Sequence, residues 1–209
     1  MTFYYLHGFA SSPRSCKAQD LCDRFTRQNL TLHIPDLNQN DFTHLTLTRQ
    51  IEQVQSSFLP GDSITLIGSS LGGLTAAWLG ESNPQVDRLI LLAPAFGLLD
   101  HWLPKLGPQQ LQQWRSGTPL AVYHHGAGRL LPLEYQFVVD CAQYESKRLQ
   151  RSVPTLVLHG IQDDVIPIQA SRDYAVDRPW VRLIELESDH ALANVSDEIW
   201  QTIETVCFN

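Results

Sequence analysis

Residues 63–79 read Ser-Ile-Thr-Leu-Ile-Gly-Ser-Ser-Leu-Gly-Gly-Leu-Thr-Ala-Ala-Trp-Leu. An apolar run typical of a buried strand ends at Gly68, and a run of small and apolar residues typical of a helix begins at Leu71. The junction carries the pattern G-x-S-x-G, which at a strand-to-helix turn exposes its serine as a nucleophile. Larger side chains two positions before and after that serine would collide, so glycine suits Gly68 and Gly72. The pattern makes Ser70 the candidate nucleophile; a glycine-rich turn with chance serines is the alternative.

A nucleophilic serine needs a base and a group that orients the base. Where this motif serves catalysis, they follow the serine in the order Asp or Glu, then His. A predicted strand at 154–158 leads to Asp163, and a predicted strand at 181–186 leads to His190. Parallel strands bring their carboxyl ends to one edge of a sheet, where ligands bind. We therefore expect His190 to take the Ser70 proton and Asp163 to fix the histidine tautomer.

Other carboxylates compete for the orienting role. Asp164 is the closest alternative, because Asp163 could instead be an Asx-turn residue. The residues after Asp164 read as the start of the next turn and helix, which favours Asp163. Asp189 directly precedes His190, and neighbouring side chains diverge. Asp100, beyond the preceding strand, is a weaker candidate.

We expect the remaining histidines to have structural roles and not catalytic ones. His7 and His159 each precede a glycine at a predicted strand end, and we expect both to be structural and hydrogen-bonded beside the site. His124 and His125 look like a metal-binding pair, but no third ligand follows at helical or loop spacing. We expect a solvated loop pair there, and no metal ion or cofactor for the chain.

These motifs resemble those of the α/β-hydrolase superfamily, and more narrowly those of the short YqiA-type bacterial esterases. The narrower resemblance rests on residues 7–18 (His-Gly-Phe-Ala-Ser-Ser-Pro-Arg-Ser-Cys-Lys-Ala) and 68–73 (Gly-Ser-Ser-Leu-Gly-Gly). The elements at 159–163 and 189–190 extend it towards the C-terminus. The resemblance implies esterase or thioesterase activity, with the serine, aspartate and histidine named above as the triad. It names no substrate.

The resemblance also implies an oxyanion hole made of two backbone N–H groups. One belongs to Leu71, the residue after the nucleophile. The other comes from the loop after the strand at 2–6, which breaks at a His-Gly pair. This assigns Phe9, with Ala10 as the alternative donor. A plain strand-end turn is the competing interpretation, and the predicted helix start that follows weighs against it.

The order of elements predicts the architecture. Apolar or alternating runs predict strands near residues 2–6, 30–34, 63–67, 88–92, 154–158 and 181–186. Helical patterns lie between most of them, and such alternation predicts a mainly parallel sheet with helices on both faces. Counted against the superfamily, the His-Gly strand at residues 2–6 corresponds to the third strand, so we expect the first two strands of the full fold to be absent. We expect a minimal α/β-hydrolase that forms a single domain over residues 1–209.

The segment 97–152 interrupts this alternation. It carries four prolines and several bulky aromatic residues, and it follows the strand after which this fold usually accepts a lid. Inserted segments of this length are more often functional than idle. We expect a small helical lid or loop insertion in which Trp102 and Trp114 help to line an acyl-chain groove. An ordinary crossover helix with a decorated loop is the alternative.

Charge and cysteine content restrict the partners and the compartment. Fifteen basic and 22 acidic residues give a net charge of −7, which disfavours a nucleic-acid partner. Arg14 and Lys17 could form a local basic patch beside the site, but chance placement of solvent-exposed side chains is the favoured interpretation. The four cysteines show no C-x-x-C spacing. With no signal peptide expected and no apolar run long enough for a membrane span, we expect a cytoplasmic protein with reduced thiols.

These observations favour a serine hydrolase that cleaves carboxylic esters or thioesters of small molecules through an acyl-Ser70 intermediate. An amide or peptide hydrolase, or an acyltransferase, could use the same three residues. A binding module on a degenerate hydrolase scaffold is a third hypothesis. The presence of all three residue types at compatible places argues against degeneracy.

Overall fold

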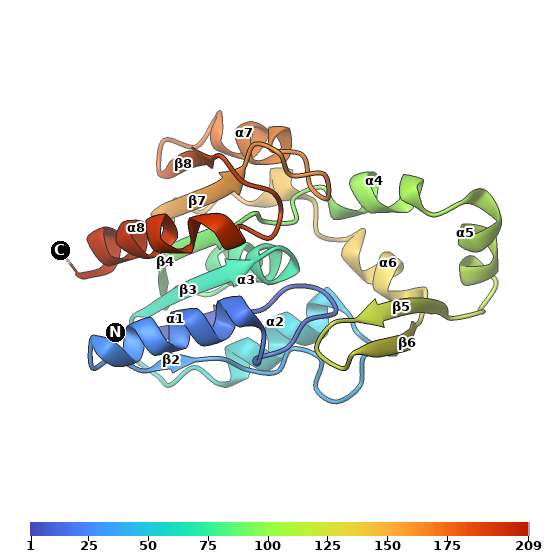
Figure 1. Cartoon of the computed structure of the whole chain (residues 1–209), viewed down its shortest axis with the longest axis horizontal. Helices are drawn as coiled ribbons and strands as arrows, with labels where there is room; N and C mark the ends of the chain where they lie inside the picture. Colours follow the sequence, from blue (N-terminus) through green and yellow to red (C-terminus); the bar gives the residue numbers. More distant parts are fainter. Residues whose placement is uncertain (209) are drawn as a thin grey trace.

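The computed structural model describes residues 1–208. Within that range six strands form the main sheet, in the order β2-β1-β3-β4-β7-β8, and each neighbouring pair is parallel (Figure 1). These strands are β1 (Thr2–Leu6), β2 (Leu32–His33), β3 (Ile64–Ser69), β4 (Val86–Leu92), β7 (Thr155–Gly160) and β8 (Val181–Leu186). All six strands expected from the sequence are present, although β2 is shorter than predicted.

Helices cover both faces of the sheet, as the alternating pattern predicts (Figure 1). These helices are α1 (Cys16–Arg27), α2 (Leu47–Ser56), α3 (Leu71–Ser82), α7 (Gln169–Ala175) and α8 (Ser196–Phe208). Successive side chains of a strand point to opposite faces. In β1, Phe3 and Tyr5 therefore pack with α1 and α8, whereas Tyr4 and Leu6 pack with α2 and α3.

The register of the sheet brings several loops to one edge. Leu6 of β1 pairs with Gly68 of β3, and Ser69 of β3 pairs with Leu92 of β4. Leu92 in turn pairs with Leu158 of β7. The carboxyl ends of these strands therefore lie side by side, and the loops that leave them share a single rim.

Between β4 and β7 the chain leaves the sheet and extends beyond this rim (Figure 1). The segment contains α4 (Leu98–Trp102), the 3-10 helix η1 (Leu103–Lys105), α5 (Pro108–Arg115), β5 (Leu120–His124), β6 (Arg129–Leu133), α6 (Gln136–Cys141) and η2 (Ser146–Arg148). The antiparallel β5–β6 hairpin is not predicted by the sequence, because Pro132 interrupts the second strand. It forms because its two strands pair across a short turn, independently of the main sheet.

The buried side chains of the segment belong to the hydrophobic core on one face of the sheet. Trp114 is almost fully buried and donates its indole N–H to the carbonyl of Leu133. The backbone N–H of Glu134 donates to the carbonyl of Thr43, which ties the hairpin to the loop before α2. Trp114 therefore holds the segment together and does not line an open groove, which corrects its expected role.

Candidate active site

Ser70 lies in a strained turn between β3 and α3. Its φ is +53° and its ψ is −117°, a conformation that is unfavourable for any residue with a side chain. The end of β4 holds this turn in place. The N–H of Ser70 donates to the carbonyl of Leu92, and the carbonyl of Ser70 accepts from the N–H of Ala95. The surrounding backbone thus maintains the sharp turn predicted by the motif.

The two glycines of the motif are required by close backbone packing. A Cβ atom built on Gly68 would overlap the carbonyl of Gly72, and one built on Gly72 would overlap the carbonyl of Leu6. In both cases the obstacle is backbone, which cannot rotate away as a flexible side chain could. Both positions therefore exclude every residue except glycine.

The side chains of Ser70, Asp163 and His190 form a hydrogen-bonded chain. Nε2 of His190 lies 3.0 Å from Oγ of Ser70, and Nδ1 of His190 lies 2.6 Å from Oδ2 of Asp163. Because a carboxylate only accepts, Nδ1 carries the proton and Nε2 is left to accept from the serine. Asp164, the alternative acid, is exposed and is not placed against His190; its carbonyl accepts from Nζ of Lys105.

The side chain of Asp163 is buried and accepts four hydrogen bonds. Oδ1 accepts from the backbone N–H groups of Val165 and Ile166, each at 2.8 Å. Oδ2 accepts from His190 and from Nε2 of His159 at 3.0 Å. Burial would raise the pKa of Asp163, but the bonds from His159, His190 and Ile166 outweigh it and hold that pKa well below its usual range. The carboxylate is therefore ionised and fixed in position.

His159 supports the acid more directly than the sequence suggests. Its Nε2 also lies 2.9 Å from the carbonyl of Ile166, which can only accept, so Nε2 carries a proton and donates to Asp163 as well. Its Nδ1 lies 2.7 Å from Oγ of Ser171. The spacing of four residues between His159 and Asp163 across a strand-end turn is the only sequence signal for this contact.

The other histidines occupy structural positions. His7 accepts the backbone N–H of Leu37 on Nε2 and bonds the carbonyl of Gly8 through Nδ1, in keeping with the expected structural role. His124 ends β5 and is buried, which corrects the prediction of a solvated loop residue there, whereas His125 is exposed as predicted. Its ring packs edge-on against Phe42 at 4.8 Å, because the β5–β6 hairpin folds back over the loop that carries Phe42.

Two backbone N–H groups near Ser70, those of Leu71 and Phe9, have no hydrogen-bond partner among the described residues. Leu71 opens α3, and the first N–H groups of a helix lack acceptors within the helix. The loop after β1 passes close to the nucleophile, since a Cβ built on Gly8 would lie 3.4 Å from Cβ of Ser70. Within residues 1–208, no protein acceptor is hydrogen-bonded to the N–H of Leu71 or of Phe9. Ala10, the alternative donor, is buried with φ at +52°.

Comparison with known protein families shows which family the chain belongs to. A profile of the uncharacterised protein family UPF0227 matches residues 2–207. The chain belongs to this family. The match covers nearly the whole chain, and it confirms the resemblance drawn from the short motifs.

Solved structures show which fold this UPF0227 member shares. Mouse alpha/beta hydrolase domain-containing protein 10 is 19% identical, with a TM-score of 0.79 over 98% of this chain and 88% of that one. The monoacylglycerol lipase of Paleococcus ferrophilus is 16% identical, with a TM-score of 0.75 over 98% and 92%. Est1E from Butyrivibrio proteoclasticus, with ferulic acid bound, is 15% identical, with a TM-score of 0.75 over 98% and 87%. The predicted α/β-hydrolase fold is confirmed.

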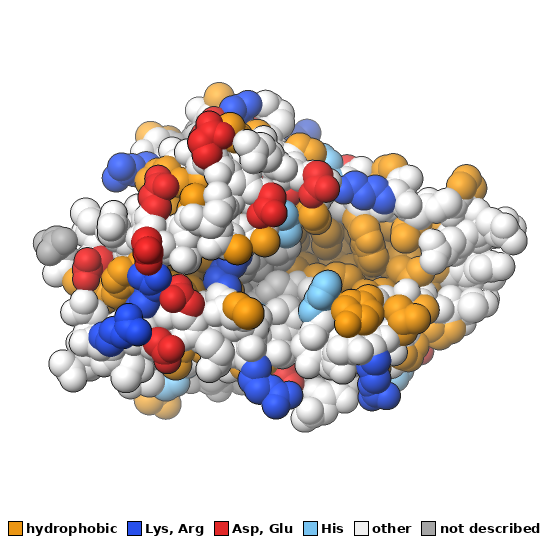
Figure 2. All heavy atoms as spheres, viewed as in Figure 1, with side chains coloured by type: hydrophobic (Ala, Val, Ile, Leu, Met, Phe, Trp, Pro, Cys, Tyr) orange, Lys and Arg blue, Asp and Glu red, His pale blue; other side chains and the backbone are white. Residues whose placement is uncertain are grey.

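In this UPF0227 protein the candidate catalytic residues open into a cavity of about 950 Å³. Ser70, His190 and Phe9 form part of its wall. The start of α1, the start of α8 and the turn of the β5–β6 hairpin at 125–126 complete it. Figure 2 shows this face of the molecule hollowed between the sheet and the segment 97–152, with hydrophobic side chains along the hollow.

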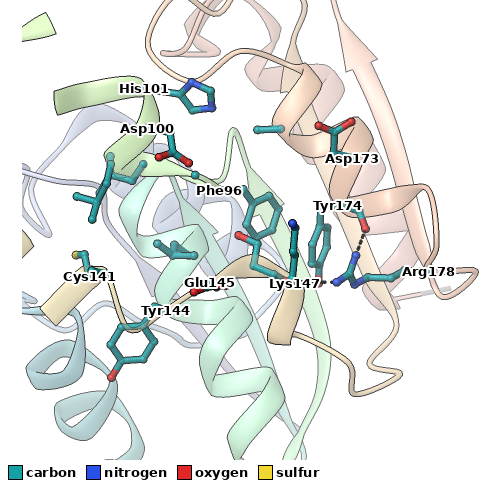
Figure 3. Close-up of a pocket in the computed structure, with 17 residues that line it drawn as sticks. Phe96, Asp100, His101, Cys141, Tyr144, Glu145, Lys147, Asp173, Tyr174 and Arg178 are labelled. Carbon is teal, nitrogen blue, oxygen red and sulfur yellow. Dashed lines mark hydrogen bonds between the residues drawn. The ribbon is translucent and has the colours of Figure 1, made fainter. Parts of the chain in front are cut away.

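A second cavity of about 710 Å³ lies between α4, α6 and α7 (Figure 3). The rings of Phe96 and Tyr174 stack in it at 4.1 Å, and the guanidinium of Arg178 lies over Tyr174 at 4.5 Å. Asp100, the weaker candidate for the acid, lines this cavity and not the one at Ser70.

In the described part of the chain, no three His, Cys, Asp or Glu side chains gather as the ligands of a metal ion would. Over the same residues 1–208, no helix has both the length and the apolar character needed to cross a membrane.

Proposed function

We propose that this protein is a serine hydrolase that cleaves carboxylic esters or thioesters through an acyl-Ser70 intermediate. The hydrogen-bonded chain from Ser70 through His190 to Asp163 carries the proposal. It is accompanied by the unpartnered N–H groups of Leu71 and Phe9 on the same rim. A lipase is among the proteins of similar structure, which supports the proposal. Because one fold can host many reactions, the proposal depends mainly on the geometry of the site.

The first half-reaction transfers the acyl group to the enzyme. Nε2 of His190 takes the Ser70 proton while Oγ attacks the acyl carbon, and the carbonyl electron pair moves onto oxygen. The N–H groups of Leu71 and Phe9 stabilise the resulting oxyanion. When the tetrahedral intermediate collapses, the bond to the alcohol or thiol breaks, and the leaving group takes the proton from His190. Asp163 remains ionised and stabilises the imidazolium.

The second half-reaction releases the acid. His190 removes a proton from water, whose oxygen attacks the acyl carbon of the ester on Ser70. The second tetrahedral intermediate breaks the bond to Oγ, and Ser70 recovers its proton from His190. The reaction consumes one water and needs no further reactant.

We further infer that the segment 97–152 acts as a lid insertion within a single domain and that the hollow beneath it takes the acyl chain. Phe9 links the two parts of the site: its ring lies 5.3 Å from Trp102 and 5.3 Å from Phe137. Trp102 is only partly buried and stands at the boundary of the hydrophobic core. An acyl chain placed along this surface would leave water, which is worth ~0.8 kcal/mol per methylene.

A fluorophosphonate probe read by intact mass tests the nucleophile directly. Wild-type protein should gain one adduct, whereas Ser70→Ala should gain none. Ser69→Ala is the matched control and should be labelled like wild type. On nitrophenyl esters, Ser70→Ala should lower kcat by roughly four to six orders of magnitude without changing thermal stability. An adduct on Ser69, or full turnover by Ser70→Ala, would contradict the assignment.

The competing functions predict different outcomes. An amide hydrolase would cleave nitroanilides at least as well as matched esters, and an acyltransferase would form more transfer product than acid when an alcohol is added. A binding module would neither label nor turn over any ester. A panel of nitrophenyl esters, acyl-CoA thioesters and nitroanilides of equal acyl length separates these cases.

A further inference from the structure

Lys17 lies beside the candidate nucleophile and lacks an acidic partner. It is the second residue of α1, and its Nζ donates to Oγ of Ser69 at 3.1 Å. Within the described residues, no carboxylate oxygen lies within 4.0 Å of this ammonium group. An ammonium has three donors, so two remain for a group in the cavity.

Among the residues that line the cavity beside Lys17, two are cationic, Arg14 and Lys17, and one is acidic, Asp20. Arg14 also lines the cavity and forms no ion pair within residues 1–208. The nearby carboxylate of Asp20 is already engaged, because Nε of Arg24 lies 2.9 Å from both of its oxygens. The first turn of α1 contains no acidic residue, and its positive end borders the same cavity. This local charge contrasts with the net charge of −7 for the whole chain.

The position of Lys17 is unfavourable for the folded protein alone. Burial lowers the pKa of the Lys17 ammonium to about 8, although Asp189 and Asp163 partly offset the effect. A hydrogen bond to one serine hydroxyl does not compensate a cation for the hydration it loses. A bound anion would compensate it, and would be attracted more strongly there than in water.

We propose that the cavity at Ser70 selects esters or thioesters that carry a carboxylate or phosphate group, and that the Lys17 ammonium binds this anion. The inference rests on the proposed function, since it assigns a substrate class to the same site. Lys17 contacts the residue next to the nucleophile, so the anion lies within a few bonds of the cleaved carbonyl. Arg14, at the exposed end of the cavity, adds attraction for a negative substrate.

A structural role for Lys17 makes the opposite prediction. If the lysine served only to hold Ser69, its loss would affect every ester equally and would lower thermal stability. Ser69→Ala, which removes the acceptor and keeps the charge, would then reproduce the loss of Lys17.

Three chromogenic esters test the proposal. 4-Nitrophenyl butyrate is neutral, mono-4-nitrophenyl succinate carries a carboxylate on the acyl part, and the butyrate ester of 5-hydroxy-2-nitrobenzoic acid carries one on the leaving group. The quantity compared is kcat/KM for each anionic ester divided by kcat/KM for the neutral ester. Lys17→Met should lower this ratio about ten- to hundredfold for at least one anionic ester, through KM. The affected ester shows which part of the substrate bears the anion.

Matched variants isolate the charge. Lys17→Arg should retain most of the preference, because it keeps the cation. Lys147→Met, a change at an exposed lysine remote from the cavity at Ser70, should leave the ratio at its wild-type value. Lys17→Met should melt no lower than wild type, because a partly buried cation is replaced by an apolar side chain of similar length. An unchanged ratio in Lys17→Met, or an equal loss with Ser69→Ala on all three esters, would overturn the proposal.

Binding separates this inference from the proposed function. Calorimetric titration of Ser70→Ala with the intact esters needs no turnover. At least one of the two anionic esters should bind about tenfold or more tightly than the neutral ester, and adding Lys17→Met should abolish that difference. Absence of turnover by wild type would contradict the proposed hydrolase, whereas equal binding of the three esters would contradict the role of Lys17.

Discussion

Nε2 of His190 lies 3.0 Å from Oγ of Ser70, although 120 residues separate them in the chain. The contact exists because Ser70 follows β3 and His190 follows β8, and both strands end at the same edge of one parallel sheet. Base and nucleophile are thus held by independent loops. Single substitutions can therefore probe each of them without removing the other.

Asp163→Asn should lower kcat by roughly 10³ to 10⁴ on a neutral ester, by analogy with other triads. All four bonds to this carboxylate come from donors: two backbone N–H groups, His159 and His190. The NH₂ group of the asparagine must face either the two backbone N–H groups, which cannot accept a hydrogen bond, or the two histidines. Facing the histidines favours the tautomer in which Nδ1 of His190 accepts and Nε2 carries the proton, so Nε2 can no longer take the proton of Ser70. Steady-state kinetics check the effect.

Asp164→Asn is the control and should stay within about tenfold of wild type, because Asp164 is exposed. A larger loss of kcat with Asp164→Asn than with Asp163→Asn would show that Asp164, and not Asp163, orients His190.

The ionisation of Asp163 should make the thermal stability of the protein depend on pH in the acidic range. The pKa of Asp163 is lowered in the folded state, so its contribution to stability is complete above its unfolded value of about 4 and is lost as pH falls below it. The gap in Tm between wild type and Asp163→Asn should therefore narrow from pH 6 to pH 3. Thermal unfolding across that range measures the gap, with Asp164→Asn as reference. A constant gap would show that the folded protein does not depend on this ionisation.

Anionic esters should lose their advantage in alkali. Since burial lowers the pKa of Lys17 to about 8, kcat/KM for the preferred anionic ester should fall as pH rises through 8, while the neutral ester should show no such fall. Lys17→Arg should keep the advantage to higher pH. The titratable or charged groups around Lys17 are Tyr5, Arg14, Cys16, Asp20, His125, Asp163, Asp189 and His190. Identical pH profiles for the two esters would exclude Lys17 as the anion-binding group.

Acyl length should matter if the hollow under the segment 97–152 binds the chain. We expect kcat/KM to rise several-fold per two carbons from acetyl to about hexanoyl or octanoyl, and then to level off. Trp102→Ala should flatten the rise, since Trp102 contacts Phe9 at the edge of the hollow. Trp114→Ala should mainly lower Tm, because its indole is buried and bonded to Leu133. If kcat/KM of the wild type did not change with acyl length on nitrophenyl esters, the lid hypothesis would be wrong.

Local pattern was sufficient for much of the fold. The stretch 63–79 predicts a strand, a sharp turn and a helix, because hydrophobic periodicity and paired glycines act over a few residues. Strand–helix alternation then predicts a parallel sheet, and with it a shared rim for the residues after each strand. The β5–β6 hairpin could not be predicted in this way, because a proline weakens the strand pattern of its second strand. Only the pairing between the two strands specifies the hairpin.

The sequence by itself thus determined the fold class, the order of the candidate residues and Ser70 as the candidate nucleophile. Only the tertiary structure decided that Asp163 rather than Asp164 meets His190, that His124 is buried, and that Lys17 points at Ser69. Adjacent residues and exposed or buried histidines look alike in a local pattern. What distinguishes them is contact between segments far apart in the chain, and such contacts are set by the packing of the whole sheet and its helices.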